Sequence, residues 1–263
     1  MTSPASEQLK VLVVDDDEMN RRMMHLILTR EDHYVELASD GFEACEAVQK
    51  NNFDIILMDL QMPKIDGVET SRRIRASGDA GRQAYIVALT ASYLPEKGNE
   101  LFEAGIDNYI AKPFDVGHLR QMLKHGLDHR KGDAKYDSTN VEKDGDEMEQ
   151  GFSPVIGLRQ VGGDEEMFRE LLADFANELP QKIDNMEKCL GERDMDGLSR
   201  DAHNLKGVSS NLGALQLSQH AGRLENKAGE GYTEAVYLEM KEIKTVSGEF
   251  INSATNFLNT ETK

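Results

Sequence analysis

The chain has 263 residues, enough for two domains that each bury a hydrophobic core. Its 48 acidic residues exceed its 30 Lys and Arg residues, and the formal net charge of −18 repels nucleic-acid phosphates and anionic lipids. The two cysteines, Cys45 and Cys189, have no metal-ligand spacing, and no apolar run is long enough to span a bilayer. We therefore expect a cytoplasmic protein that neither binds nucleic acid nor inserts into a membrane.

The first half of the chain alternates short apolar runs with longer amphipathic stretches, which is typical of βα units on a parallel sheet. Five strands are predicted at residues 10–15, 34–39, 54–59, 84–90 and 107–112. Five helices are predicted at residues 18–30, 42–50, 68–76, 95–104 and 115–128. Residues 1–130 should therefore form an α/β domain with a five-stranded, doubly wound parallel sheet of the flavodoxin-like type.

Residues 131–150 contain almost no apolar side chains and many Lys, Asp and Glu residues, which predicts a flexible linker. From residue 151 to residue 263 the apolar residues recur every three to four positions, which is typical of helices. The predicted helices cover residues 165–178, 181–190, 195–209, 215–228 and 233–257. Their short connections favour an all-α domain built as an up-and-down four-helix bundle.

Polar side chains stand at the ends of four predicted strands in the first half. The first strand ends in the DDD motif, Asp15, Asp16 and Asp17. Asp59 ends the third strand, Thr90 ends the fourth and Lys112 ends the fifth. A single acidic cluster of this kind is usually a solvated turn or a helix cap. Ligands of doubly wound sheets bind at the carboxyl ends of the strands, where the strand order reverses. The combined placement of these residues therefore predicts one functional site.

Three carboxylates in one pocket repel one another unless a cation holds them ionised. Mg²⁺ prefers oxygen ligands and phosphate oxygens, so it fits such a site, and Mn²⁺ is an alternative. An ionised Asp beside the metal can attack a phosphoryl group and form an acyl phosphate. Lys112 and the Thr90 hydroxyl group can then donate hydrogen bonds to the phosphoryl oxygens.

Four segments resemble the signature segments of the two-component response-regulator receiver family: VLVVDDDEMNRR, DIILMDLQMPKIDGVE, IVALTA and NYIAKPF. The resemblance extends over about residues 8–130. It implies that Asp59 is the phosphoacceptor, that Asp16 binds the metal directly and that Asp15 reaches it largely through water. It also implies that the backbone carbonyl group of Gln61 is a further metal ligand.

The same resemblance assigns roles to the remaining polar residues of the predicted site. Lys112 would bind the phosphoryl group, and Thr90 and Tyr109 would form a switch pair. In such a pair the hydroxyl group moves toward the phosphoryl group while the aromatic ring changes its exposure.

One predicted helix of the second half carries a histidine beside the face that packs into the bundle. Its sequence is GLSRDAHNLKGVSSNLGA, in which His203, Lys206, Gly207 and Ser210 share a face next to the apolar stripe. We expect this face to be solvated and the His203 imidazole to point outward. Gly207, one turn later, would leave room for a partner, and Lys206 would offset the charge of a phosphorylated imidazole.

The string HNLKG resembles the HxLKG segment of histidine phosphotransfer (HPt) domains, and the following SSNLGA also matches that family. The resemblance extends over about residues 152–258. It implies that His203 carries a phosphoryl group. Together, the two resemblances imply a phosphorelay protein in which a receiver domain (residues 1–130) is joined by a linker (131–150) to an HPt domain (151–263).

The sequence shows no recognisable ATP-binding kinase domain, DNA-binding helix-turn-helix or catalytic output domain. We therefore expect a phosphotransfer signalling protein and not an enzyme, apart from the receiver's catalysis of its own phosphorylation and dephosphorylation. A sensor histidine kinase or a small phosphodonor would charge it, and another receiver domain or response regulator would exchange phosphate with its HPt domain.

Two alternatives from other functional classes remain open from the sequence. The first is a phosphohydrolase of the haloacid dehalogenase type, in which Asp15 on the first strand would be the nucleophile. The second is a binding switch, in which phosphorylation of Asp59 controls docking of the helical bundle and His203 never carries phosphate. Acyl phosphates are labile in alkali and phosphohistidine is labile in acid, so the stability of the phosphorylated protein separates these alternatives.

Overall fold

The structure is a computed structural model that describes residues 8–78, 81, 83–90, 98–112, 116–131 and 151–260. The chain divides into two compact units, which are treated separately below. The predicted linker, residues 131–150, lies outside the described residues except for Lys131, where a helix of the first unit ends. None of the described helices has the length and apolar composition that crossing a membrane requires.

The first unit contains a five-stranded sheet in which all the strands are parallel. The strands are β1 (Lys10–Val14), β2 (Tyr34–Ala38), β3 (Ile55–Asp59), β4 (Tyr85–Thr90) and β5 (Asn108–Ala111). Their order is β2-β1-β3-β4-β5, so the chain leaves β1 in one direction for β2 and returns past it to β3. The predicted doubly wound sheet is therefore confirmed, and its strand order reverses beside β1 and β3.

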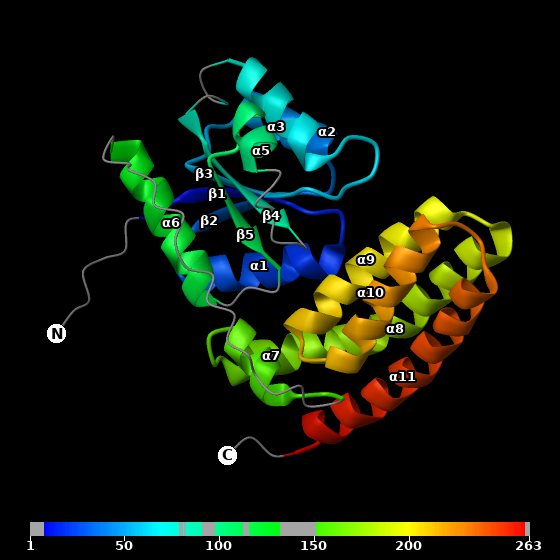
Figure 1. Cartoon of the computed structure of the whole chain (residues 1–263). Coiled ribbons are helices and arrows are strands. Elements are labelled where there is room, and N and C mark those ends of the chain that lie inside the picture. Colours follow the sequence, from blue (N-terminus) through cyan, green and yellow to red (C-terminus); the bar gives the residue numbers. More distant parts are fainter. Residues whose placement is uncertain are drawn as a thin grey trace. The chain divides into compact units, whose positions relative to one another are not determined.

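Helices connect these strands and cover both faces of the sheet (Figure 1). They are α1 (Glu18–Arg30), α2 (Gly41–Lys50), α3 (Gly67–Ala76), α5 (Gly98–Glu103) and α6 (Val116–Lys131). The side chains of Asp17, Asp40 and Asp66 cap the first three by accepting hydrogen bonds from backbone N–H groups of the first turn. The helix predicted at residues 95–104 begins, in the described residues, at Gly98.

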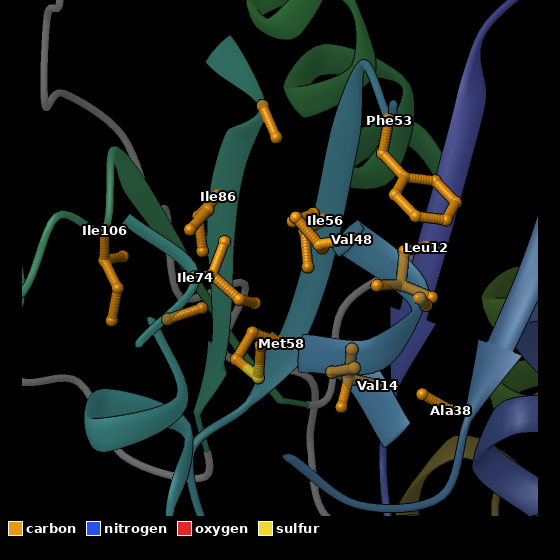
Figure 2. Packing of buried hydrophobic residues seen from close by; sticks show 14 of the residues in the cluster. Leu12, Val14, Ala38, Val48, Phe53, Ile56, Met58, Ile74, Ile86 and Ile106 are labelled. Carbon is orange, nitrogen blue, oxygen red and sulfur yellow. The ribbon is translucent and has the colours of Figure 1, made fainter. Parts of the chain in front are cut away.

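Alternation along the strands places their apolar side chains on both faces of the sheet. Leu12 and Val14 of β1 and Ile56 and Met58 of β3 pack on one face with apolar residues of α2 and α3 (Figure 2). On the opposite face, Gly126 of α6 lies so close to β3 that an added Cβ would be 2.4 Å from Ile55. These two packed layers hold the carboxyl ends of the strands in fixed positions.

The second unit is a bundle of four long helices with one short helix before them (Figure 1). The helices are α7 (Pro154–Gln160), α8 (Glu165–Glu192), α9 (Met195–Asn211), α10 (Leu215–Gly229) and α11 (Glu234–Leu258). The predicted four-helix bundle is confirmed. The short α7 was not predicted; it begins with a proline and packs closely on α8, where a Cβ added to Gly157 would be 2.2 Å from Phe168.

Helix α8 corrects one prediction from the sequence. Two helices were expected, at residues 165–178 and 181–190, with Pro180 between them. A proline normally interrupts a helix. The structure has one continuous helix, with Pro180 inside it. Phe175 and Leu179 before the proline and Ile183 after it are all buried in the bundle. Packing along both halves offsets the backbone hydrogen bond that a proline removes.

Candidate functional site

Three carboxylates meet at the carboxyl ends of β1 and β3. Asp15 directly follows β1 and is 1% exposed, Asp16 is half-buried, and Asp59 is the last residue of β3 and 2% exposed. One carboxylate oxygen from each residue lies within 4.8 Å of the others, so the three can share a metal ion. Because β1 and β3 are neighbours in the sheet, the strand order itself brings these residues together.

Lys112, the residue after β5, neutralises part of this acidic pocket. Its Nζ atom donates hydrogen bonds to Asp59 Oδ2 at 2.7 Å and to Asp15 Oδ2 at 2.9 Å. Burial alone would lower the pKa of Lys112, but the charges of Asp15 and Asp59 outweigh it and raise that pKa above its usual range. The lysine is therefore a fixed positive charge beside Asp59.

Burial raises the pKa of Asp15, and the neighbouring charge of Asp59 adds to this effect, whereas Lys112 acts in the opposite direction. The three carboxylates and one lysine leave two negative charges in a pocket with little access to water. The donor set consists of carboxylate oxygens, which are hard ligands. It therefore fits a divalent cation such as Mg²⁺, which would offset the remaining charge.

Neighbouring residues of α1 hold the Asp15 carboxylate in place. Its Oδ1 atom accepts hydrogen bonds from the backbone N–H of Asp17 at 3.0 Å and from Asn20 Nδ2 at 3.2 Å. Arg21 donates to the backbone carbonyl of Asp15 at 2.6 Å. The Asp17 side chain caps α1 and does not belong to the carboxylate cluster. The DDD motif thus contributes two residues to the cluster and one to the helix cap.

The other residues predicted for this site lie at the same edge of the sheet. Thr90 ends β4 and is buried, and its carbonyl group accepts a hydrogen bond from the backbone N–H of Lys112 at 2.6 Å. Tyr109 in β5 is half-buried against the apolar core. The backbone N–H of Gln61 donates to Asp59 Oδ1 at 3.2 Å, which places Gln61 beside the cluster. Gly67 is also close, since an added Cβ would be 2.2 Å from the Asp59 carbonyl oxygen.

The environment of His203 corrects a second prediction. The imidazole was expected to point outward on a solvated face, but the His203 side chain is only 8% exposed. Its Nδ1 atom lies 2.8 Å from Glu225 Oε1 on α10, the helix that packs most extensively on α9. A helical wheel of α9 alone does not show this covering helix, and Glu225 was therefore missed.

Glu225 also binds the lysine of the HNLKG motif. Lys206 Nζ donates to Glu225 Oε2 at 3.1 Å, so one carboxylate holds both the histidine and the lysine. Burial would raise the pKa of Glu225, but hydrogen bonds and charges from His203 and Lys206 keep it below its usual range. An ionised carboxylate can only accept a hydrogen bond, so this contact calls for a proton on Nδ1 of His203; in that neutral tautomer the ring lone pair is on Nε2.

Three glycines lie in α9, in α10 and in the turn between them. Gly222 of α10 faces Lys206, where an added Cβ would make only an ordinary contact, 3.4 Å from the Lys206 side chain. Gly207, the residue predicted to leave room for a partner, is half-buried in α9. Gly213 adopts φ +74 in the turn to α10, and an added Cβ would be 2.1 Å from the Ser153 carbonyl oxygen.

A doubly wound sheet with an acidic pocket and a buried lysine, followed by a helical bundle with a carboxylate-bound histidine, defines the class of phosphorelay signalling proteins. Residues 11–124 match the family model of the response regulator receiver domain. Residues 170–246 match the model of the Hpt domain. The chain therefore belongs to the two-component signalling proteins and contains a receiver domain followed by an Hpt domain.

Several curated relatives that align with most of this chain are sensor kinases. The signal transduction histidine-protein kinase BarA of Shigella flexneri is 26% identical over 238 residues, which cover 89% of this chain and 25% of the kinase. The aerobic respiration control sensor protein ArcB of Escherichia coli O157:H7 is 26% identical over 242 residues, covering 90% of this chain and 30% of ArcB. The chain thus spans less than a third of the length of these relatives.

Solved receiver structures resemble the first unit. The receiver domain of the Pseudomonas aeruginosa PAO1 sensor histidine kinase PA1611, with a magnesium ion in its active-site cleft, is 32% identical, with a TM-score of 0.43. The comparison covers 46% of this chain and 98% of that domain. The chemotaxis response regulator CheY4 of Vibrio cholerae is 34% identical, with a TM-score of 0.44, and covers 46% of this chain and 100% of CheY4.

Proposed function

We propose that the receiver domain accepts a phosphoryl group on Asp59 and that the Hpt domain carries one on His203. The proposed limits are residues 1–130 for the receiver, 131–150 for the linker and 151–263 for the Hpt domain. The observation that carries this proposal is the buried contact of Lys112 with both Asp15 and Asp59 at the carboxyl ends of the strands. That geometry suits transfer of a highly charged group to Asp59.

In the receiver, an oxygen of Asp59 attacks the phosphorus atom of a phosphodonor, and the donor's bond to phosphorus breaks. The carboxylates of Asp15, Asp16 and Asp59, with the backbone carbonyl group of Gln61, would hold Mg²⁺ or Mn²⁺. The ion would neutralise charge on the phosphoryl oxygens. Lys112, which contacts the attacking carboxylate, would donate to a phosphoryl oxygen as charge builds up.

Thr90 and Tyr109 are the proposed switch pair. Thr90 ends β4, the strand next to β3, at the same edge of the sheet as Asp59. Tyr109 lies on β5 and is half-buried against the apolar core, so a change in its packing would also change the exposure of its ring. A hydrogen bond from Thr90 to the phosphoryl group would couple the two residues.

In the Hpt domain, Nε2 of His203 attacks the phosphorus atom of an aspartyl phosphate. The P–N bond forms as the P–O bond breaks, and the electron pair returns to the aspartate carboxylate. Glu225 keeps the proton on Nδ1 and stabilises positive charge that develops on the ring. Lys206 would exchange its contact with Glu225 for one with the phosphoryl group, and Gly207 would leave the approach open.

The proposed partners are an upstream sensor histidine kinase and a downstream receiver or response regulator, in the cytoplasm. We further propose that the chain performs phosphotransfer and no other enzymatic reaction. The match of residues 11–124 to the receiver model favours this function over the phosphohydrolase alternative, in which Asp15 would be the nucleophile. The binding switch without phosphate on His203 is the remaining alternative.

Charging of the purified chain tests the receiver part of this proposal. With Mg²⁺ and acetyl phosphate, we expect an alkali-labile phosphoryl group on Asp59, detected by mass spectrometry of peptides. Chelation of Mg²⁺ or the substitution Asp59→Asn should abolish it. Asp32→Asn is the matched control, since Asp32 is exposed and its φ of 62 is tolerated by Asn. Full labelling of Asp59→Asn would refute the assignment.

A further inference from the structure

A second histidine of the Hpt domain has the same kinds of partner as His203. His220 Nδ1 on α10 lies 2.6 Å from Oε1 of Glu239 on α11. Lys227 Nζ donates to the other oxygen of the same carboxylate. One glutamate therefore holds a histidine by Nδ1 and a lysine by Nζ, as Glu225 does for His203 and Lys206.

The glutamate of the second arrangement is more buried than the glutamate of the first. The Glu239 side chain is 7% exposed, compared with 16% for Glu225. Burial would raise the pKa of Glu239, but its contacts with Lys227 and His220 keep it below the usual range. The carboxylate is therefore ionised at neutral pH. It can only accept a hydrogen bond from His220, which calls for a proton on Nδ1; in that neutral tautomer the lone pair on Nε2 is the nucleophile.

Access and charge around His220 also suit a phosphoryl group. The His220 side chain is 14% exposed, compared with 8% for His203. Arg223 is exposed and follows His220 by three positions in the same helix, so the two side chains are neighbours on its surface. Lys206 has the same spacing from His203. A guanidinium group binds phosphate oxygens with two hydrogen bonds, which makes Arg223 a suitable partner.

We propose that His220 is a second phosphoacceptor of the Hpt domain and takes a phosphoryl group on Nε2 from a receiver aspartyl phosphate. The P–N bond forms as the P–O bond to the aspartate breaks, and the electron pair returns to that carboxylate. The Nδ1 proton stays on the ring, bound to Glu239. Arg223 binds the transferred phosphoryl oxygens. This inference rests on the proposed function only for the identity of the donor.

A purely structural role would give the same contacts, since the carboxylate ties α10 to α11. The two roles differ in whether His220 becomes labelled. Trypsin separates the two histidines, because cleavage at Arg200, Lys206 and Arg223 gives peptides 201–206 and 207–223, each with one histidine. Peptide mass spectrometry at alkaline pH, where phosphohistidine is stable, therefore reports on each site separately.

The first arm uses the full chain with His203→Gln, charged with Mg²⁺ and acetyl phosphate. We expect an acid-labile phosphoryl group in peptide 207–223 that disappears when Asp59→Asn or His220→Gln is added. An unlabelled peptide 207–223 in a chain whose Asp59 is charged would overturn the proposal. In the single variant His220→Gln, labelling of peptide 201–206 shows that the bundle remains folded.

The second arm uses phosphoramidate, which labels imidazoles directly and does not need Asp59. Glu239→Gln should reduce labelling of His220 about tenfold, because a hydrogen bond to a charged group is worth at least one factor of ten. Glu242→Gln, an exposed carboxylate on the same helix as Glu239, is the matched control and should leave labelling of peptide 207–223 unchanged. If Asp59 is not phosphorylated in the first arm, the proposed receiver function is wrong, and only this second arm tests whether His220 can be phosphorylated. Labelling that does not depend on Glu239 would overturn the inference.

Discussion

The contact between Glu225 and His203 makes a prediction that can be worked out from the structure. Glu225→Gln keeps the size of the side chain and an oxygen for Nδ1, but it removes the negative charge that also binds Lys206. A hydrogen bond to a charged group contributes roughly 1.5–3 kcal/mol, and the part-exposed Lys206 contributes less. We expect the free energy of unfolding of the Hpt domain to fall by about 1–2 kcal/mol at pH 7.

The same substitution should change the pH dependence of stability in a defined direction. The pKa of Glu225 in the folded protein lies below its usual range, so its contribution is present above the unfolded pKa, near 4.3. This contribution is lost as the pH falls through the folded pKa. Urea unfolding of the wild type should therefore show a loss of stability below about pH 4.3 that Glu225→Gln lacks.

Glu242→Gln is the matched control, because Glu242 is an exposed carboxylate on α11. In phosphotransfer assays, Glu225→Gln should lower the rate of labelling of His203 about tenfold, since the ring loses its charged partner. Equal stability of Glu225→Gln and wild type at pH 7, with the same loss in acid and normal transfer, would refute this account of the site.

Three further predictions concern the two sites. Lys112→Ala leaves the buried carboxylates of Asp15 and Asp59 without their lysine, so the free energy of unfolding of the receiver in urea should fall by about 3 kcal/mol. Added Mg²⁺ should restore part of this loss. An unchanged free energy of unfolding would contradict the buried contact of Lys112 with the two carboxylates. Gly67→Ala should displace the segment after β3 and slow phosphorylation of Asp59, because the new Cβ would be 2.2 Å from the Asp59 carbonyl oxygen. A normal rate of phosphorylation would contradict this, since it would mean that the segment can move without disturbing Asp59. Gly207→Phe should block transfer to His203 while helical circular dichroism stays near wild type; normal transfer would mean that partners approach from another side.

The sequence was sufficient to predict most of the fold and the meeting of the acidic side chains with Lys112. Apolar periodicity marks strands and helices directly, and the ends of parallel strands must meet at one edge of the sheet. Asp15, Asp59 and Lys112 could therefore be placed together, although they lie at the ends of three different strands. The backbone topology determines where these residues meet, and the identities of their side chains then indicate the chemistry of the site.

The Hpt site was predicted less completely because its geometry depends on packing between helices. The pattern of α9 identifies His203 but not the helix that covers it, so neither its burial nor its contact with Glu225 was foreseen. The continuity of α8 through Pro180 has the same origin, since tertiary packing outweighs a local preference. A Glu on the next helix has no local signal that distinguishes it from a solvated carboxylate.

Phosphate transfer from Asp59 to His203 is the central claim, and a time course tests it most directly. The full chain is charged with Mg²⁺ and acetyl phosphate, freed of donor, and sampled for alkali-labile phosphate on Asp59 and acid-labile phosphate in peptide 201–206. We expect the His203 signal to rise as the Asp59 signal falls, and to be absent in Asp59→Asn. Decay of the Asp59 signal to inorganic phosphate, with no label in peptide 201–206 even when other receiver and Hpt domains are added, would contradict the claim and favour the binding switch.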